Sequence, residues 1–388
     1  MYELLWLLLP VAAASGWLIG RGAKQPRDRN PEFGMRTAYF RGLNYLLNEQ
    51  PDKAIEVFVK ILEVDSETVE THLALGNLFR RRGEVDRAIR IHQNLIARPA
   101  LSKEQKAEAL LELGQDYMRA GLFDRAENIF LELINMRMHA DAARAHLLDI
   151  YQQEKEWESA IDVVRSLTTL SQPERQLLIG QFYCELADEA IAKSDFQMAR
   201  QMLRKALSAD PQCVRASITE GDLAVRRADY KSALRAYRRV EEQNRDYLPE
   251  VISSLRECYE KLGDREGFIG FLRQVQQHYQ GMSVLLALAE EIRRKGDEGE
   301  ANAFLVEQLG KKPSVRGLDW LLEKNLDQAE GKSRENLLVL RKITQALLEQ
   351  KPAYLCSRCG YSAKSLHWHC PSCKSWSSIK QVQGVAGE

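Results

Sequence analysis

The chain has 388 residues and contains 55 Lys and Arg against 55 Asp and Glu, so its formal net charge is zero. A balanced charge argues against a nucleic-acid-binding protein, which normally carries a net basic domain. The mean hydropathy of −0.39 excludes a polytopic membrane protein, and seven cysteines are too few for a disulfide scaffold. A single membrane span remains compatible with these averages, because the rest of the chain dilutes it.

The first segment, from Leu4 to Gly20, has no charged side chain. Its length is at the lower end of what spans a bilayer as a helix. Tyr2, Trp6 and Trp17 lie near its two ends, where aromatic rings favour the membrane interface. A cleaved secretory signal would begin with basic residues, whereas this chain begins Met-Tyr-Glu. We therefore predict a transmembrane anchor over residues 1–20.

The segment after the anchor indicates the orientation. Residues 21–30 contain four basic residues and one acidic residue, and the positive side of a single span faces the cytoplasm. The body of the protein is therefore expected to be cytoplasmic, joined to the anchor by a basic linker over residues 21–35. Gly16 and Gly20 form a GxxxG pair that would allow a second copy to pack closely, so a homo-oligomer is possible.

A repeated pattern of small and aromatic residues covers residues 36–330. Its first members recur at intervals close to the helix–turn–helix period of about 34 residues that is the tetratricopeptide signature. These first members are Gly42, Gly76, Gly114, Leu148, Ala187 and Gly221, and weaker copies follow around Tyr259 and Leu288. About eight repeats are predicted, with a degenerate ninth possible, so the fold class is an all-α superhelical solenoid.

Turn and cap residues fit this assignment. We expect a backbone with positive φ at the turns that contain Gly83, Gly121, Gly263 and Gly296. We expect Asp86, Asp124 and Asp229 near the starts of the second helices, where a carboxylate caps the helix or opposes its dipole. The prolines at 99, 173, 211, 249 and 313 fall near repeat ends rather than in helix interiors.

The repeats contain no recognisable catalytic arrangement. The histidines His72, His92, His139, His146 and His278 are scattered, and packing or surface roles are expected for them. Cys184, Cys213 and Cys258 stand singly and are expected to be small buried hydrophobes. A solenoid presents an extended concave surface, so the array is predicted to hold a protein client and not to be an enzyme.

The last part of the chain has a different character. Residues 331–352 are predicted to form a terminal helix that ends at Pro352, and residues 353–380 a metal-binding domain. Two Cys-x-x-Cys pairs lie ten residues apart and would bring four thiolates to one tetrahedral point, which suits zinc or iron. The predicted ligands are Cys356, Cys359, Cys370 and Cys373.

The surroundings of the cysteines favour one structural metal site, followed by a tail over residues 381–388. His367 and His369 lie nearby, but four thiolates already fill a tetrahedral site. Tyr361, Trp368 and Trp376 are predicted to form a miniature core, which the metal must stabilise in so short a domain. The basic residues of this domain also admit a nucleic-acid-binding ribbon, but the neutral net charge of the chain disfavours that interpretation.

The order of anchor, tetratricopeptide array and C-terminal cysteine pairs resembles the lipopolysaccharide assembly protein B (LapB) family of Gram-negative bacteria. The resemblance rests on the anchor through Gly20, the repeats from Gly42 to Pro313, and the sequence YLCSRCGY…HWHCPSCKSW at 354–376. It implies that the C-terminal domain is rubredoxin-like, with the four cysteines as metal ligands. Rubredoxin likeness implies iron, whereas thiolate chemistry admits zinc equally.

The same resemblance implies a location and a function. Members of the family sit in the bacterial inner membrane and promote degradation of the LpxC deacetylase by the FtsH protease, acting as adaptors. They are also implied to gather other lipopolysaccharide assembly proteins. The alternative from the residues alone is a rubredoxin-like electron-transfer protein carried on a tetratricopeptide scaffold.

Overall fold

A computed structural model describes residues 31–48, 50–64, 69–326, 329–385 and 387–388. The predicted anchor over residues 1–20 lies outside these ranges, so its conformation is not part of the fold described below. Within the described ranges, no helix combines the length and the apolar character needed to cross a membrane.

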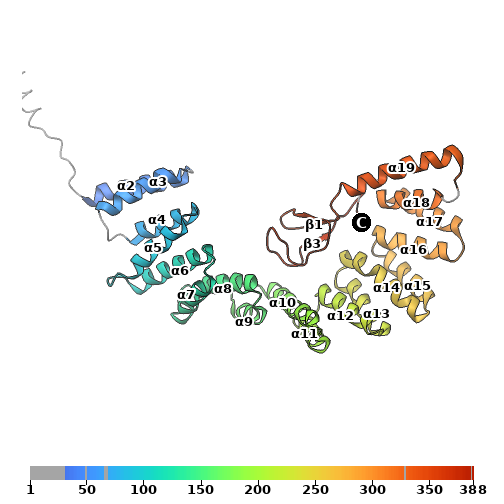
Figure 1. Cartoon of the computed structure of the whole chain (residues 1–388), viewed down its shortest axis with the longest axis horizontal. Coiled ribbons are helices and arrows are strands. Elements are labelled where there is room, and N and C mark those ends of the chain that lie inside the picture. Colours follow the sequence, from blue (N-terminus) through green and yellow to red (C-terminus); the bar gives the residue numbers. More distant parts are fainter. Residues whose placement is uncertain (1–30, 49, 65–68, 327–328, 386) are drawn as a thin grey trace, which may run out of the picture. The chain divides into compact units, whose positions relative to one another are not determined.

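The chain divides into two compact units between Glu154 and Lys155. The described part of the first unit consists of helices only (Figure 1). They are α2 (Pro31–Leu47), α3 (Pro51–Val64), α4 (Val69–Arg81), α5 (Val85–Ile96), α6 (Lys103–Arg119), α7 (Phe123–Asn135) and α8 (Ala140–Glu154). Helix α2 begins inside the segment expected as a linker, because a proline is well tolerated in the first turn of a helix.

The second unit continues the helical array and ends in a small sheet. Its helices are α9 (Trp157–Ser166), α10 (Gln172–Ala192), α11 (Phe196–Ala209), α12 (Val214–Arg226), α13 (Tyr230–Gln243), η2 (Arg245–Tyr247), α14 (Leu248–Leu262), α15 (Arg265–Gln276), α16 (Met282–Arg294), α17 (Glu298–Lys311), α18 (Val315–Leu326) and α19 (Gly331–Glu349). Helix α19 matches the predicted terminal helix and packs with α18 as a further helical pair. The division between the units falls inside the fourth predicted repeat, between α8 and α9.

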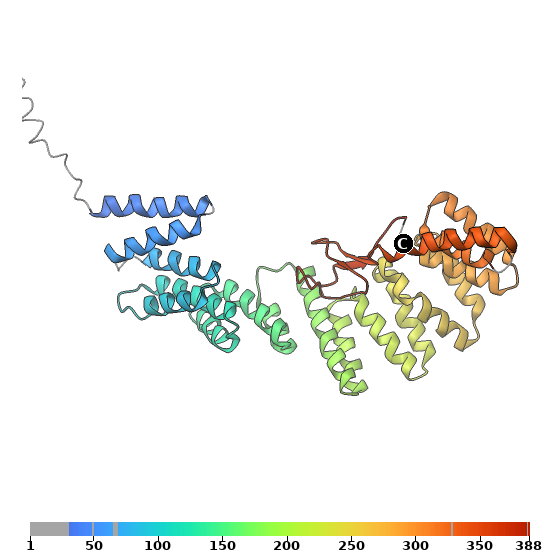
Figure 2. The same cartoon turned by 45° about the horizontal axis from the view of Figure 1, so that its top comes forward.

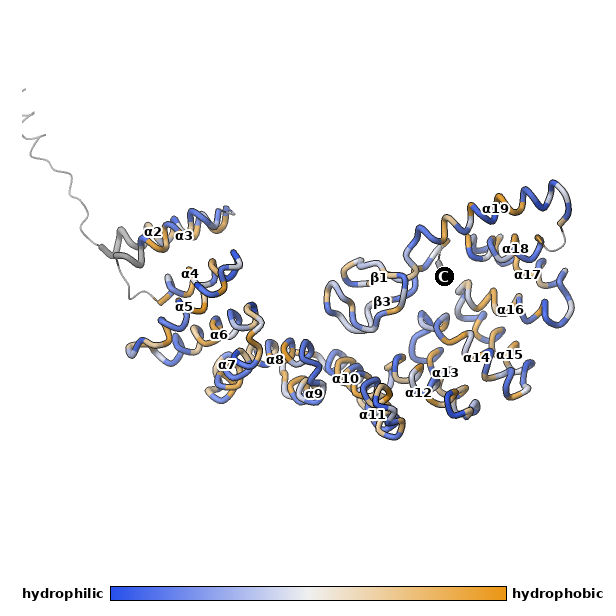
Figure 3. Tube along the Cα trace, viewed as in Figure 1, coloured by the Kyte–Doolittle hydropathy of each residue, from blue (hydrophilic) through white to orange (hydrophobic). Residues whose placement is uncertain are grey.

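A glycine beneath an aromatic ring explains the most regular part of the repeat pattern. In the third repeat, a Cβ atom on Gly114 of α6 would lie 2.6 Å from the ring of Phe130 on α7. Only a glycine therefore lets the two helices approach this closely. The same arrangement joins Gly42 to Phe58, Gly76 to His92 and Gly221 to Tyr237. Along the helices, hydrophobic residues alternate with hydrophilic ones, as expected for helices with one buried face (Figure 3).

The turns confirm the predicted backbone conformation. The φ angles of Gly83, Gly121, Gly263 and Gly296 are 82°, 74°, 70° and 99°. Other repeats place Ser194 and Ala228 in the same left-handed region, with φ angles of 61° and 56°. Asp229 caps α13 by accepting a hydrogen bond from the backbone of Ser232, as predicted. Asp86 and Asp124 also agree with the prediction, because they lie in the first turns of α5 and α7, where their charge opposes the helix dipole.

The small sheet is formed by β1 (Tyr354–Cys356), β2 (Ser362–Ala363) and β3 (Ile379–Gln381). Its strand order is β2-β1-β3, and both pairings are antiparallel. Strand β1 pairs Tyr354 with Ala363 on one side and with Gln381 on the other. Figures 1 and 2 show this sheet and its loops beside the helices of the second unit. We call residues 353–381 the cysteine module.

Candidate metal centre

Each Cys-x-x-Cys pair of the cysteine module forms the same tight turn. The N–H of Gly360 donates to the carbonyl of Cys356 at 3.0 Å, and the N–H of Lys374 donates to that of Cys370 at 3.0 Å. Gly360 and Lys374 have φ angles of 75° and 58°. The local sequence therefore builds two equivalent knuckles, and the left-handed residue after the second cysteine closes each of them.

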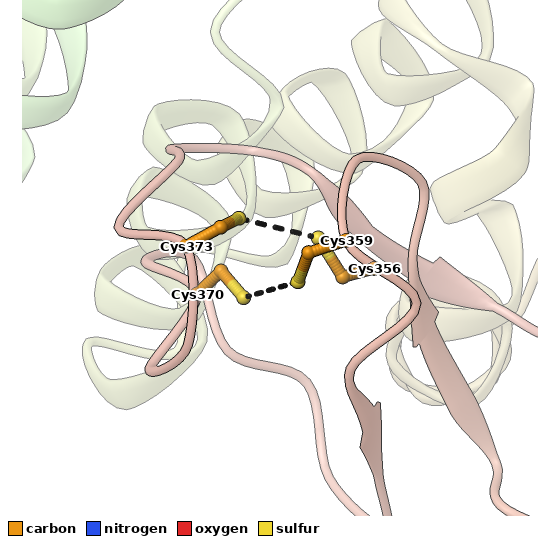
Figure 4. Close-up of side chains that lie close together, drawn as sticks. All are labelled: Cys356, Cys359, Cys370 and Cys373. Carbon is orange, nitrogen blue, oxygen red and sulfur yellow. Dashed lines mark hydrogen bonds between the residues drawn. The ribbon is translucent and has the colours of Figure 1, made fainter. Parts of the chain in front are cut away.

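The two knuckles face each other and bring the four predicted cysteines together (Figure 4). All four Sγ atoms lie within 4.8 Å of one another. The Sγ atoms of Cys356 and Cys373 are 3.7 Å apart, as are those of Cys359 and Cys370. A tetrahedral site with metal–sulfur bonds of about 2.3 Å requires sulfur–sulfur separations of about 3.8 Å. The thiols thus fit one four-coordinate metal ion.

The surroundings of the sulfurs favour thiolates to different extents. Burial opposes ionisation of Cys356, but hydrogen bonding with the Ser378 hydroxyl and with the backbone of Cys359 and Arg358 lowers the pKa of its thiol to about 6. Hydrogen bonding with the side chain and the backbone of Ser375 lowers the pKa of Cys373. Burial raises the pKa of Cys370 to about 11. A bound cation would supply the charge that this buried sulfur needs to ionise.

The nearby histidines lie outside the group of four cysteines. His369 stacks on Trp376 with ring centroids 4.3 Å apart, and its Nε2 lies 2.9 Å from the carbonyl oxygen of Lys374. His367 is 3.4 Å from the hydroxyl of Ser365. A closed set of four thiolates is the pattern of a structural zinc site or of a rubredoxin-type iron site, and it has no open position for a substrate.

The predicted miniature core of the cysteine module is only partly correct. The buried residues at its centre are Cys356, Cys370 and Ile379, and Tyr361 packs against them. Trp368 and Trp376 instead pack against the helical array. The reason is size, because a module this short lacks the surface to cover two tryptophans by itself.

Trp376 anchors one end of the cysteine module. Its ring meets those of Trp157 on α9 and Phe182 on α10 edge to face, with centroids 6.2 and 5.8 Å apart. Trp157 and Phe182 stack on each other at 5.6 Å, and the indole of Trp157 donates to Glu189 at 2.9 Å. All three rings are buried, so this aromatic cluster is a stable attachment point.

A second attachment lies at the start of α14. The ring of Tyr247 stacks on Trp368 at 5.3 Å, and its hydroxyl lies 3.2 Å from the carbonyl oxygens of both Ser377 and Ile379. Burial raises the pKa of Tyr247, so its hydroxyl keeps its proton and remains a donor.

Polar contacts complete the attachment. Glu250 on α14 accepts hydrogen bonds from Tyr354 and Gln381, each at 2.8 Å. Lys380 forms an ion pair with Asp246 at 2.6 Å. The cysteine module therefore covers the beginning of α9, the middle of α10 and the beginning of α14, and it is an integral part of the second unit.

Sequence reasoning missed the array residues that hold the cysteine module, which are Trp157, Phe182, Tyr247 and Glu250. They lie far along the chain from their partners, so no local spacing could reveal them. The only available signal was the two extra tryptophans next to the cysteines, which exceed what so small a module can bury.

A buried charged network in the first unit was also missed. The ring of His92 is fully buried, and its Nδ1 donates to Asp116 at 2.5 Å. Arg80 binds Asp116 at 2.8 Å and Glu112 at 2.6 Å. His92 follows Gly76 at the same interval at which an aromatic ring follows the glycine in other repeats, and this spacing was the available signal.

The other predicted side chains have packing roles. Cys184, Cys213 and Cys258 are buried as expected. His146 stacks on Phe130 with centroids 5.0 Å apart, and burial lowers its pKa although Asp149 acts in the opposite direction. None of these groups joins the four cysteines of the candidate metal centre.

Comparison with known proteins agrees with this architecture. Residues 354–381 match a family described as rubredoxin metal binding domain, and residues 71–106, 111–173 and 184–248 match tetratricopeptide repeats. The chain is 40% identical over 388 residues to "Lipopolysaccharide assembly protein B" of Escherichia coli (strain K12), covering all of both chains. It is 40% identical over 392 residues to the protein of the same name from Haemophilus influenzae, covering 98% of each.

Proposed function

Because the chain belongs to the lipopolysaccharide assembly protein B family, we propose that it is a membrane-tethered, non-enzymatic adaptor that regulates lipopolysaccharide synthesis. In this proposal residues 1–20 anchor it in the inner membrane, and the array works on the cytoplasmic side. The clients are the FtsH protease and its substrate LpxC, which the adaptor brings together, along with other lipopolysaccharide assembly proteins. Tethering raises the effective concentration of partners at the membrane without new contacts.

One observation carries this proposal: the cysteine module covers the beginning of α9, the middle of α10 and the beginning of α14 in the second unit. The N-terminal halves of α4, α6 and α8 in the first unit instead carry exposed side chains such as Glu70, Glu108 and Ala142. Solenoids bind partners along such surfaces. We therefore assign client binding chiefly to the first unit.

Photo-crosslinking in cells tests this assignment. A photoreactive residue is placed at Glu108 on α6 or Ala142 on α8, and a matched control is placed at the exposed Glu132 on α7. We expect FtsH or LpxC to be captured from positions 108 and 142 but not from 132. Equal capture from all three positions, or capture of neither protein, would contradict the assignment.

The proposed metal is either zinc, as in other four-Cys structural sites, or iron, as rubredoxin likeness implies. The four cysteines would hold either ion and thereby keep the cysteine module folded. Metal analysis together with the absorption spectrum of aerobically purified protein separates the two, because ferric thiolate is coloured and zinc thiolate is not.

A second candidate function is electron transfer through iron at the same site. It is favoured by Cys359, which is exposed while Cys356 and Cys370 are buried. A colourless protein with one equivalent of zinc would exclude this candidate. A reversible one-electron couple, together with a donor that reduces the site, would support it.

A further inference from the structure

The side chain of Glu388 is bound by the beginnings of α16 and α18. Its carboxylate forms an ion pair with Arg316 at 2.5 Å and accepts a hydrogen bond from the backbone N–H of Ser283 at 3.0 Å. The hydroxyl of Ser283 also donates to it, and Arg316 donates to that hydroxyl at 3.1 Å. Figure 1 shows the C-terminus beside these two helices.

This arrangement has the properties of a carboxylate-binding site. The side chain of Glu388 is completely buried, whereas that of Arg316 keeps 34% of its surface exposed. Ser283 is the second residue of α16, so its N–H belongs to the positive end of the helix dipole. A guanidinium, a backbone N–H and a hydroxyl thus converge on one anionic group, which is how proteins recognise carboxylates.

An open groove continues from the site. A cavity of about 370 Å³ lies between α14, α16 and α18, and both Ser283 and Arg316 line it. Ile252, Leu286 and Trp320 contribute apolar surface to the same cavity. Arg256 and Glu290 also line it, so a peptide that brings an acidic residue to Arg316 would meet both apolar and charged side chains there.

Backbone hydrogen bonds also hold the chain segment that carries Glu388. The N–H of Val315 donates to the carbonyl of Val385 at 2.7 Å, and the N–H of Glu388 donates to that of Val382 at 2.8 Å. The side chain of Val385 is 58% exposed. Among the described residues of this segment, 382–385 and 387–388, only Glu388 is buried.

We propose that Arg316 and Ser283 form a binding site for an acidic peptide, and that Glu388 fills this site as an internal ligand that an acidic segment of a client displaces. The identification of the competitor as a client rests on the proposed adaptor function. The carboxylate site itself does not, since its occupant is already present in the chain.

A peptide-binding experiment tests the site in the full-length protein. The probe is a fluorescently labelled peptide with the sequence of residues 381–388, QVQGVAGE, and a second probe ends in Gln. Fluorescence anisotropy is measured with the wild-type chain and with the variants Glu388→Gln and Glu349→Gln. The last variant is the matched control, because Glu349 is an exposed carboxylate elsewhere on α19.

We expect Glu388→Gln to bind the peptide about tenfold more tightly than the wild-type chain or Glu349→Gln, because the internal competitor is weakened. Adding Arg316→Gln or Ser283→Ala to Glu388→Gln should abolish the gain, and the peptide ending in Gln should bind none of the proteins. Equal binding to wild type and Glu388→Gln, or binding that survives the loss of Arg316, would overturn the site. Failure of the crosslinking experiment alone would remove the client and leave the site intact.

Discussion

The two units are built from the same kind of helical repeat, but their side chains are buried in different ways. In the first unit the repeats pack against one another, and they even bury a charged network formed by Arg80, His92 and Asp116. In the second unit the rings of Trp157, Phe182 and Tyr247 are covered by a module that lies far away in the sequence. The comparison teaches that a solenoid surface can be covered by a distant part of the same chain, which here carries the four cysteines of the candidate metal centre.

Removing the metal should produce the largest difference in stability between the two units. The double variant Cys356→Ser, Cys359→Ser, or treatment with a chelator, should unfold the cysteine module, because structural zinc sites contribute about 10 kcal/mol or more to folding. Hydrogen exchange should then show lost protection at the start of α9, in the middle of α10 and at the start of α14. Unchanged exchange there would mean that the module is held without the metal, and α4 and α6 serve as the internal control.

Truncating the central tryptophan should give the next largest effect. Trp376→Ala removes the ring that meets Trp157 and Phe182, and we expect a loss of about 3 to 5 kcal/mol in the stability of the second unit. Denaturant unfolding measures this loss. Trp368→Phe, which can still stack on Tyr247, should cost less and is the conservative comparison.

Adding a methyl group beneath the rings probes the chemistry that the units share. Gly114→Ala would place its Cβ 2.6 Å from the ring of Phe130, and Gly221→Ala would bring its Cβ into the same kind of clash with the ring of Tyr237. Each should destabilise its own unit by about 1 to 3 kcal/mol through overpacking. Hydrogen exchange of the two variants should show loosening in opposite units, and loosening of both units by either variant would break the comparison.

Lowering the pH should destabilise the first unit, by less than the substitutions described above. Burial lowers the pKa of His146, so the folded unit prefers the neutral ring. Its stabilising contribution is complete above the unfolded pKa of about 6.5 and is lost as the pH falls from there through the folded pKa. His146→Phe keeps the stacking on Phe130 and should make thermal unfolding of this unit less sensitive to pH between 7 and 5. An unchanged pH profile would show that another group governs it.

The residues explain which features could be predicted from the sequence. The repeats and the four metal ligands depend on short spacings, such as the interval from Gly114 to Phe130 or that between paired cysteines. Local sequence determines these geometries directly. His92 shows the limit of such prediction. Histidine is usually a polar surface residue, and only its place in the repeat indicates that its ring is buried in the position of an aromatic side chain.

The position of the cysteine module was beyond sequence reasoning for a physical reason. Glu250 must meet Tyr354, and Arg316 must meet Glu388, only after the array between them has folded. A pattern read along the chain contains no information on which surface of a solenoid a distant segment will touch. The surplus of tryptophan near the cysteines was the one indirect indication.

The long interval between Tyr247 and its partners has a consequence for synthesis. Tyr247 precedes Ser377 by 130 residues, and a ribosome needs on the order of ten seconds to add them. During this time the aromatic residues of the second unit are made but cannot yet be covered. A nascent chain would therefore expose an aggregation-prone aromatic surface until the cysteine module has been synthesised and has folded around its metal. Metal supply during translation, rather than only in the finished protein, would then govern how much of it escapes aggregation.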